Sequence, residues 1–280
     1  MNFRPLCIED RAWITACRDT VTHPFTALSF ASLYLWREAY GLTVAGDADH
    51  FAVRSTHDGG FYCPCGDREK CLAFLQTLES RAKVLYLTRE QAQELADLGW
   101  TVRLRSDLSE YIVSTAAEAL REGHISKSFR DKCRRFKIQN EYRARPVTAE
   151  DLPLLRRSFL AWRDNPLEKQ TVSQSVLRAA LDAYEALGMR GILLETAEGE
   201  LAYILGFENS PGMFTTALTG HSLTLPSETT VISVHELALL LDGEYALLNL
   251  EEDLGLEGLR RAKKLYSPVE LLEVYEAIKP

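Results

Sequence analysis

The chain has 280 residues, of which 46% are hydrophobic and 26% charged, and its formal net charge is −8 at pH 7. This composition excludes a disordered chain, and the length suits one large domain or two of ordinary size. The net acidity excludes a general coat for nucleic acid. The sequence lacks an apolar run of roughly 18 residues, and its first residues are charged where a signal peptide has an apolar core. We therefore expect a cytoplasmic protein without a membrane span.

The first half of the sequence predicts helices that alternate with short strands. Apolar residues at helical spacing mark the first clear helix, whose aromatic residues Phe30, Tyr34 and Trp36 are expected in the core. Two short strands then flank a glycine-containing turn. In chain order the predicted elements are helix 24–40, strands 51–54 and 61–63, helix 71–80, strand 84–87, helix 89–98 and strand 110–113.

Six cysteines are too few and too irregularly spaced for a disulfide scaffold, and they indicate reduced thiols. Cys63, Cys65 and Cys71 cluster in one segment, and with His57 they could form a zinc site. Structural zinc usually takes two separated ligand pairs, however, and the sequence has no second pair. We therefore predict a turn that carries ordinary thiols, and no bound metal.

Positive charge is concentrated between residues 121 and 145, where nine basic side chains face three acidic ones, a local net charge of +6. A helix over 125–141 would place an apolar stripe opposite a basic face. The stripe consists of Ile125, Phe129, Cys133 and Phe136, and the face of Lys127, Arg130, Arg134 and Lys137. Such like charges destabilise a helix slightly, a cost that a bound anion would offset. RNA phosphates or an anionic lipid head group are the natural candidates, and a merely solvated face is the alternative.

The second half predicts two helices, a three-strand meander, a helix, a strand, a helix and a final element. Their ranges are 151–162, 173–187, 191–195, 201–207, 213–218, 230–241, 246–250, 256–265 and 269–278. This is the order of a GNAT acyltransferase domain, and the first half follows a looser version of it. We therefore predict an α/β (α+β) chain of two tandem GNAT-like domains, 1–122 and 123–280, with mixed sheets flanked by helices.

The segment 248–268 holds the strongest local pattern. Its strand ends in Glu251, Glu252 and Asp253, and a tight turn then opens a helix. On a helical wheel Leu259, Ala262, Leu265 and Tyr266 face the core, while Arg260, Lys263 and Lys264 lie on the other arc. Acids at a strand end beside a basic helix predict a polar site, and mutually satisfied ion pairs are the alternative. The candidate catalytic residues are Glu252, Asp253 and Arg260, and Lys263 and Lys264 are candidate anion ligands.

The same segment, EEDLGLEGLRRAKKLYSP, resembles the D-L-G-x-E-G-L-R-x-A-K-x-x-Y-x-P signature of the DUF2156 family, which includes Gly255, Glu257 and Gly258. That family resembles the C-terminal domain of phosphatidylglycerol lysyltransferase. Further similarity lies in FASLYLWREAYG, in the YCPCG turn and in DLSEYIV before the basic helix. The resemblance implies a tandem GNAT fold and transfer of an aminoacyl group from charged tRNA to phosphatidylglycerol. Asp253 and Arg260 would then line the reaction cleft, and the basic helix would bind tRNA or lipid phosphate.

Departures from the family pattern keep three functional hypotheses open. The family commonly has a Glu-Lys pair after the third strand of the second half, where this chain reads TTALTGHSLTLPSETT. The first hypothesis is an aminoacyl-tRNA-dependent transferase with a lipid or small hydroxyl or amine acceptor, and with Asp253, Glu252 or His221 as base. The second is an acyl-CoA N-acyltransferase, disfavoured because no glycine that could cradle the pyrophosphate of acetyl-CoA lies from His221 to Leu241. The third is a binding module without catalysis.

Overall fold

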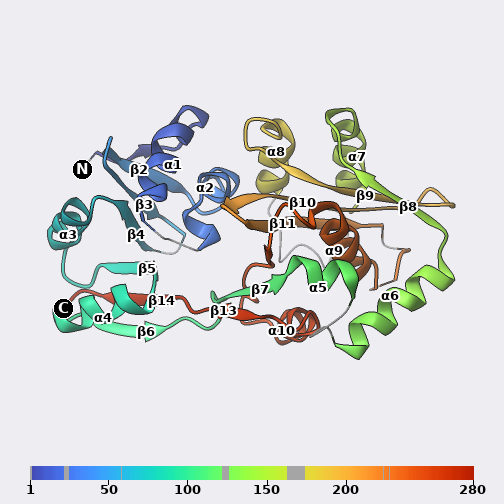
Figure 1. The fold of residues 1–280 in the computed structure, drawn as a ribbon. Coiled ribbons are helices and arrows are strands. Elements are labelled where there is room, and N and C mark those ends of the chain that lie inside the picture. The colour runs from blue at the N-terminus through green and yellow to red at the C-terminus, as the bar shows by residue number, and fades with distance from the viewer. Residues whose placement is uncertain are drawn as a thin grey trace. The chain divides into compact units, whose positions relative to one another are not determined.

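The computed structural model describes residues 2–21, 25–57, 59–121, 126–162, 174–222, 224–226 and 228–280. They form two compact units, one of Met1–Glu110 with Leu272–Pro280 and the other of Tyr111–Leu271. Each unit is built on one seven-stranded sheet with helices packed on it (Figure 1). Among the described helices, none combines the length and the apolar character that crossing a bilayer requires.

The first sheet has the strand order β1-β2-β3-β4-β5-β14-β6. Strands β2, β3 and β4 form an antiparallel meander, and β4 then pairs in parallel with β5. The helix predicted over 24–40 is shorter, since α2 spans Phe30–Trp36, with the hydroxyl of Ser29 as its N-cap. The strands of this sheet are β1 Arg4–Pro5, β2 Leu42–Asp47, β3 His50–Ser55, β4 Gly60–Gly66, β5 Lys83–Leu87, β6 Thr101–Leu104 and β14 Tyr275–Ile278. The other helices are α1 Arg11–Asp19, α3 Arg68–Thr77 and α4 Arg89–Asp97.

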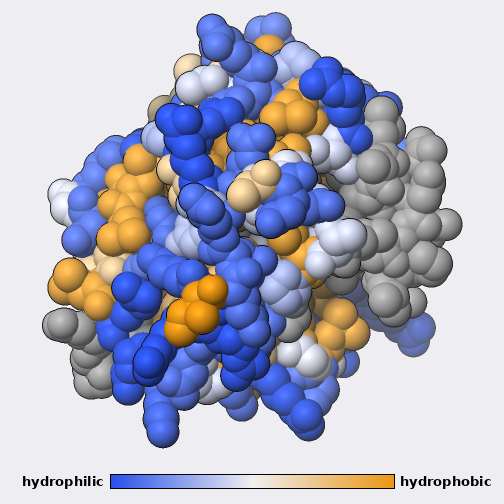
Figure 2. All heavy atoms as spheres, turned by 90° about the vertical axis from the view of Figure 1, so that its right-hand side faces the viewer, coloured by the Kyte–Doolittle hydropathy of each residue, from blue (hydrophilic) through white to orange (hydrophobic). Residues whose placement is uncertain are grey.

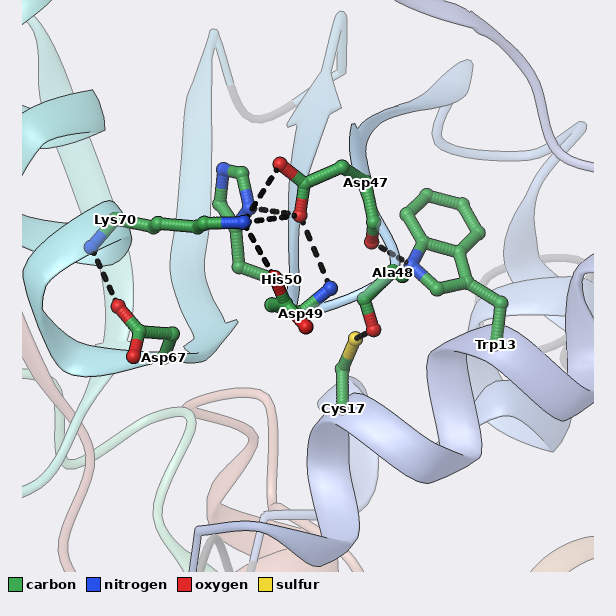
Figure 3. A network of polar contacts seen from close by, with 8 residues as sticks. All are labelled: Trp13, Cys17, Asp47, Ala48, Asp49, His50, Asp67 and Lys70. Carbon is green, nitrogen blue, oxygen red and sulfur yellow. Dashed lines mark hydrogen bonds and ion pairs between the residues drawn. The ribbon is translucent and has the colours of Figure 1, made fainter.

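A polar network fastens the β2–β3 turn to α3 (Figure 3). The ammonium group of Lys70 on α3 lies 3.0 Å from a carboxylate oxygen of Asp47 and 2.5 Å from one of Asp49. Nδ1 of His50 lies 3.0 Å from Asp47, and the carboxylate of Asp67 caps α3 by accepting the backbone N–H of Lys70 at 3.0 Å. Because Lys70 on α3 bridges two carboxylates of the β2–β3 turn, we interpret this cluster as a structural clasp.

The cysteine-containing segment is a strand, which corrects the predicted turn. Cys63 and Cys65 are buried in β4, and burial raises the pKa of both thiols. Pro64 between them has no N–H to donate to a neighbouring strand. The β3–β4 pairing accommodates it by an irregularity between Phe51 and Val53, as a proline inside a sheet requires. Local sequence suggested a turn here because Pro and Gly are usually turn residues.

The second sheet has the order β13-β7-β12-β11-β10-β9-β8. The predicted meander is confirmed as β9, β10 and β11, all antiparallel, followed by α9 and by β12, which pairs in parallel with β11. The strands are β7 Glu110–Ser114, β8 Tyr142–Pro146, β9 Arg190–Thr196, β10 Leu201–Ser210, β11 Met213–His221, β12 Leu247–Asn249 and β13 Glu270–Leu272. The helices are α5 Thr115–Leu120, α6 Lys127–Gln139, α7 Leu152–Trp162, α8 Gln174–Asp182, α9 Glu228–Leu241 and α10 Glu257–Lys264.

Helix α9 is the central helix of the second unit. It is apolar on most of its surface, and Ile232, Leu237 and Leu241 are fully buried, as expected for a helix covered on several sides. It lies against β9, β10 and β11 with α5 and α6 packed beside it, while α7 and α8 lie on the other face of the sheet (Figure 1). The core therefore fills the space between the sheet and α5, α6 and α9.

Two strands pair at positions that the sequence order did not indicate. Strand β7, expected to close the first half, pairs with β12 of the second sheet. The segment predicted over 269–278 divides into β13 in the second sheet and β14, which lies between β5 and β6 of the first. The units are therefore separated between Glu110 and Tyr111, not after residue 122, and the C-terminal strand returns to the first unit.

Candidate functional site

A polar turn follows β12, at the point where β12 ends and its parallel neighbour β11 continues. Strands β11 and β12 pair over Met213–Thr215 and Leu247–Asn249, and β11 then continues to His221 while β12 ends. The chain reverses through backbone with positive φ at Glu251 (61°), Leu254 (52°) and Gly255 (73°). Carboxyl ends of strands in open α/β sheets are common ligand sites, so this turn is the candidate functional site of the second unit.

Asp253 is fully buried in this turn, and its carboxylate accepts four hydrogen bonds. Oδ2 accepts from the hydroxyl of Tyr111 at 2.6 Å and from Nε of Arg260 at 2.8 Å. Oδ1 accepts from the backbone N–H of Gly255 at 2.8 Å and from Nη2 of Arg260 at 3.2 Å. Burial raises the pKa of Asp253, but the hydrogen bonds from Arg260, Tyr111 and Gly255 more than offset it, and the pKa lies below its ordinary value. Asp253 is therefore an ionised anchor and a poor proton acceptor.

Arg260 is held by Asp253 yet keeps part of its guanidinium at the surface. Its side chain is 32% exposed, and Nη1 has a carboxylate oxygen of Glu257 at 3.8 Å. The hydrogen bond and the charge of Asp253 raise the pKa of Arg260 further above its ordinary value. A guanidinium fixed on one side by a buried carboxylate presents its remaining N–H groups in a defined direction, which suits it to bind an anion or a developing negative charge.

Lys263 corrects the predicted outer arc of α10. Its ammonium group is buried, donates a hydrogen bond to the carbonyl of Leu250 and lies 6.0 Å from the ring centroid of Tyr111, whereas Ala262 is exposed. The carbonyl of Leu250, which follows β12, needs a hydrogen-bond donor. The side chain of Lys263 on α10 points inward and supplies it. Lys263 therefore supports the turn and is no surface anion ligand, while Lys264 remains exposed.

The other residues of the signature have different environments. Glu252 is half-buried, and Glu257 is exposed and forms an ion pair with Nε of Arg261 at 2.9 Å. Gly255 is required by its positive φ, since other residues adopt that conformation at a cost. Gly258 has open space where a side chain would lie, so packing does not explain it.

The predicted amphipathic character of the basic helix is confirmed in α6. Phe129, Cys133 and Phe136 are fully buried. The cations Lys127, Arg130, Arg134 and Lys137 are exposed, and Lys137 forms an ion pair with Glu236 at 3.3 Å. Residue Ile125 of the predicted stripe lies outside the described residues. Figure 2 looks onto the side of the second unit that carries α6, and most of the atoms visible there are hydrophilic, with separate small apolar patches.

Helices α6 and α10 meet at their ends. The hydroxyl of Ser126, which caps α6, donates to the carbonyl of Leu265 at 2.8 Å, and the rings of Phe129 and Tyr266 lie 5.3 Å apart. This contact brings the start of the basic face near the exposed Lys264. Arg260 lies farther back along α10 and points to Asp253. The second unit thus has a basic surface on α6 and a separate anchored arginine at the turn.

Two polar residues of the second unit were not predicted as site residues from the sequence. Tyr111, the partner of Asp253, was visible only as one position of the DLSEYIV segment. Glu118 on α5 is 1% exposed, and among the described residues neither of its carboxylate oxygens has a hydrogen-bond partner. Nδ1 of His235 lies 2.8 Å from the backbone oxygen of Glu118, so this buried histidine packs against α5. The signal for Glu118 was its place between apolar residues in a short helix.

Comparison with known families gives one match, over residues 20–278, to the C-terminal domain of phosphatidylglycerol lysyltransferase. The chain belongs to this family. No functionally curated protein matches it. The sequence signature predicted this family. The polar turn, with Asp253 and Arg260, lies in that signature.

Solved structures agree with that assignment. A conserved protein of unknown function from Bacteroides thetaiotaomicron VPI-5482 has a TM-score of 0.89 at 23% identity, with all of both chains covered. The C-terminal DUF2156 domain of a putative lysylphosphatidylglycerol synthetase from Agrobacterium fabrum has a TM-score of 0.71 at 15% identity, with 97% of this chain and 92% of that chain covered. L-PGS from Bacillus licheniformis has a TM-score of 0.62 at 16% identity, with coverages of 85% and 84%. The predicted fold class, tandem GNAT-like units with mixed sheets, is confirmed.

Proposed function

We propose that this protein is an aminoacyltransferase that takes its acyl group from an aminoacyl-tRNA and passes it to a hydroxyl or amine acceptor. The observation that carries the proposal is Arg260, held by the buried Asp253 and partly open to solvent at the end of β12. Arg260 lies in the signature segment of this family, the C-terminal domain of phosphatidylglycerol lysyltransferase. The proposed donor is cytoplasmic, which agrees with the location predicted from the sequence.

For this reaction the protein needs only to position the two substrates and to stabilise the negative charge of the intermediate. The acceptor oxygen or nitrogen attacks the carbonyl carbon of the ester, and the carbonyl oxygen gains negative charge. Collapse of this intermediate expels the ribose oxygen of the tRNA, which takes a proton. In the proposed role, the open N–H groups of Arg260 stabilise the negative charge of the intermediate. Because the ester is already activated, no metal is needed.

The proton acceptor in this scheme is not Asp253, whose hydrogen bonds and lowered pKa hold it as an anchor. Glu252, which is half-buried next to it, and His221 at the end of β11 are the two other candidates from the sequence. Nδ1 of His221 lies 2.9 Å from the backbone oxygen of Ser222, which leaves Nε2 as the nitrogen for proton transfer.

The basic face of α6 supports RNA as the donor. Lys127, Arg130 and Arg134 lie on one exposed stripe of an otherwise acidic chain. A row of cations attracts the phosphates of an RNA strand, and the affinity should then fall steeply with salt. An anionic lipid head group is the alternative partner of this face and also one candidate acceptor, and a soluble acceptor is the other.

Transfer from radiolabelled aminoacyl-tRNA to a panel of lipid and soluble acceptors tests the proposal. We expect Arg260→Gln to lower the transfer rate by about 100-fold, the usual effect of losing one stabilising donor. Arg261→Gln is the matched control, since Arg261 is exposed, adjacent and paired only with Glu257 in the described contacts, and it should change the rate less than about twofold.

Three outcomes separate the alternatives. Equal rates for the Arg260 and Arg261 variants would refute the role of Arg260. Binding of tRNA without transfer to any acceptor would support a module without catalysis. Micromolar binding of acetyl-CoA in a calorimetric titration, together with no binding of tRNA at low salt, would replace the proposal by an acyl-CoA N-acyltransferase.

A further inference from the structure

Three aromatic rings at the end of α2 form a parallel stack in the first unit. The ring centroids of Trp36 and Tyr40 are 5.0 Å apart with an interplanar angle of 14°. Those of Tyr40 and His57 are 5.1 Å apart at 22°. We call Trp36, Tyr40 and His57 the aromatic ladder. Ring pairs such as Trp13–Phe51 and Tyr62–Tyr86 instead meet edge-on, at interplanar angles of 75° and 74°.

The aromatic ladder is partly open to solvent, which the sequence did not predict for this segment. Phe30 is buried as expected, but Tyr34 and Trp36 are only partly buried, so the core assignment of these two was wrong. Tyr40 is partly exposed and stacks with both Trp36 and His57, and His57 is exposed. Among the described residues Tyr40 is the ring partner of His57, so the other, outer face of His57 is the open end of the ladder.

Backbone contacts fix the orientation of the ladder. The backbone N–H of Tyr40 donates to the carbonyl of Trp36 at 2.9 Å, and that of His57 donates to the carbonyl of Tyr40 at 3.2 Å. Gly41 between them has φ 55°, and a Cβ at this position would come within 2.0 Å of the hydroxyl oxygen of Thr56. The end of α2 and the chain after β3 are thus held in close contact. The three ring planes of the ladder are therefore already oriented without a ligand.

Polar groups with unused hydrogen-bonding capacity border the ladder. Within the residues that the structure describes, the indole N–H of Trp36 and the ring nitrogens of His57 have no hydrogen-bond partner. The guanidinium of Arg37, the residue after Trp36, lies over the ring of Tyr34, 3.7 Å from its centroid, and 3.5 Å from the carboxylate of Glu38. Flat π faces with hydrogen-bonding edges are among the features by which proteins hold unpaired nucleic-acid bases.

We propose that the aromatic ladder is a stacking platform for an unpaired purine base, which extends the stack on the outer face of His57. The inference rests on the proposed function in one respect, since the unpaired 3′ end of the tRNA donor would supply the base. A free adenine nucleotide offers the same ring. Both sources share the chemistry of a flat, hydrogen-bonding purine, and the experiment distinguishes them.

The experiment uses the full chain and a short RNA whose 3′-terminal adenine is replaced by fluorescent 2-aminopurine. Stacking on an aromatic ring quenches this base, so we expect quenching by the wild-type protein. His57→Ala should weaken binding by about fivefold or more, as expected for loss of one base–aromatic stack. His57→Phe keeps a flat ring and should retain the quenching. Phe3→Leu is the matched control, because it removes a partly exposed but tilted ring from the same unit, and it should leave binding unchanged.

Competition then identifies the source of the base. Displacement by adenosine monophosphate indicates recognition of the purine itself, whereas displacement only by RNA indicates a 3′ end with its phosphates, and either result supports the platform. Equal affinity of wild-type and His57→Ala proteins, with circular dichroism showing both folded, would overturn it. The assay contains neither aminoacyl group nor acceptor, so quenching without transfer would refute the transferase alone. Transfer with quenching that His57→Ala leaves unchanged would refute the platform alone.

Discussion

Replacing Glu118 by glutamine probes an unpaired acid inside the second unit. The side chain is 1% exposed, and in the described structure neither carboxylate oxygen has a hydrogen-bond partner. Burial raises the pKa of this carboxyl group from its ordinary 4.5 to about 8. The folded protein therefore carries Glu118 protonated at neutral pH, while the unfolded chain carries it ionised.

The sign of the pH effect follows from this difference. Between pH 4.5 and 8 unfolding releases a proton, so the free energy of unfolding falls as pH rises, by about 1.4 kcal/mol per pH unit. Over the full shift the loss amounts to about 5 kcal/mol, and it is complete above pH 8. Glutamine cannot ionise, so Glu118→Gln should be more stable than the wild type by several kcal/mol at pH 9 and similar to it at pH 5.

Urea unfolding followed by circular dichroism at pH 5, 7 and 9 measures this effect. The ionisable groups that interact with Glu118 are Cys133, Tyr266 and His235, and Arg121, Lys137 and Glu236 interact in turn with Cys133 and His235. Burial lowers the pKa of His235, so its contribution is lost at acid pH and does not overlap with that of Glu118 above pH 7. Glu198→Gln, in an exposed turn, is the control. Parallel pH profiles for Glu118→Gln and the wild type would refute the reasoning.

Two further predictions concern stability. Phe136→Ala should lower the free energy of unfolding by about 3–5 kcal/mol because the ring is fully buried, whereas Arg134→Ala on the exposed face of the same helix should change it by less than about 0.5 kcal/mol. Chemical denaturation checks both, and equal effects would contradict the orientation of α6. Gly255→Ala should cost about 1–2 kcal/mol because of its φ of 73°, while Gly258→Ala, with open space in a helix, should stabilise by up to about 1 kcal/mol. Thermal melts of the two variants that shift in the same direction would contradict this assignment.

The candidate site could be located from the sequence, but its internal arrangement could not. The acids after a strand and the basic helix after a glycine turn are local signals, and they indicated Asp253 and Arg260 correctly as neighbours at the end of β12. Which of these groups is buried depends on the partners that the fold supplies. Asp253 meets Tyr111, which lies far away in the chain, and Lys263 meets the carbonyl of Leu250. The helical wheel had no information on either contact and placed Lys263 outside.

Helix α6 shows what the sequence determined by itself. Its apolar residues recur at the helical period, so the buried face of Phe129, Cys133 and Phe136 and the opposite cations follow from the geometry of one helix. The order of strands and helices from α7 to α10, and with it the GNAT-like fold class, likewise follows from local periodicity and turn residues.

Only the tertiary structure decided which distant segments pair. Strand β14 lies between β5 and β6, and β7 lies between β12 and β13, although short strands of similar composition could pair elsewhere. Strand pairing is set by backbone hydrogen bonds and by the packing of whole faces, and neither is encoded in the spacing of neighbouring residues. The same reason explains why the open stack of Trp36, Tyr40 and His57 and the unpaired Glu118 became visible only in three dimensions.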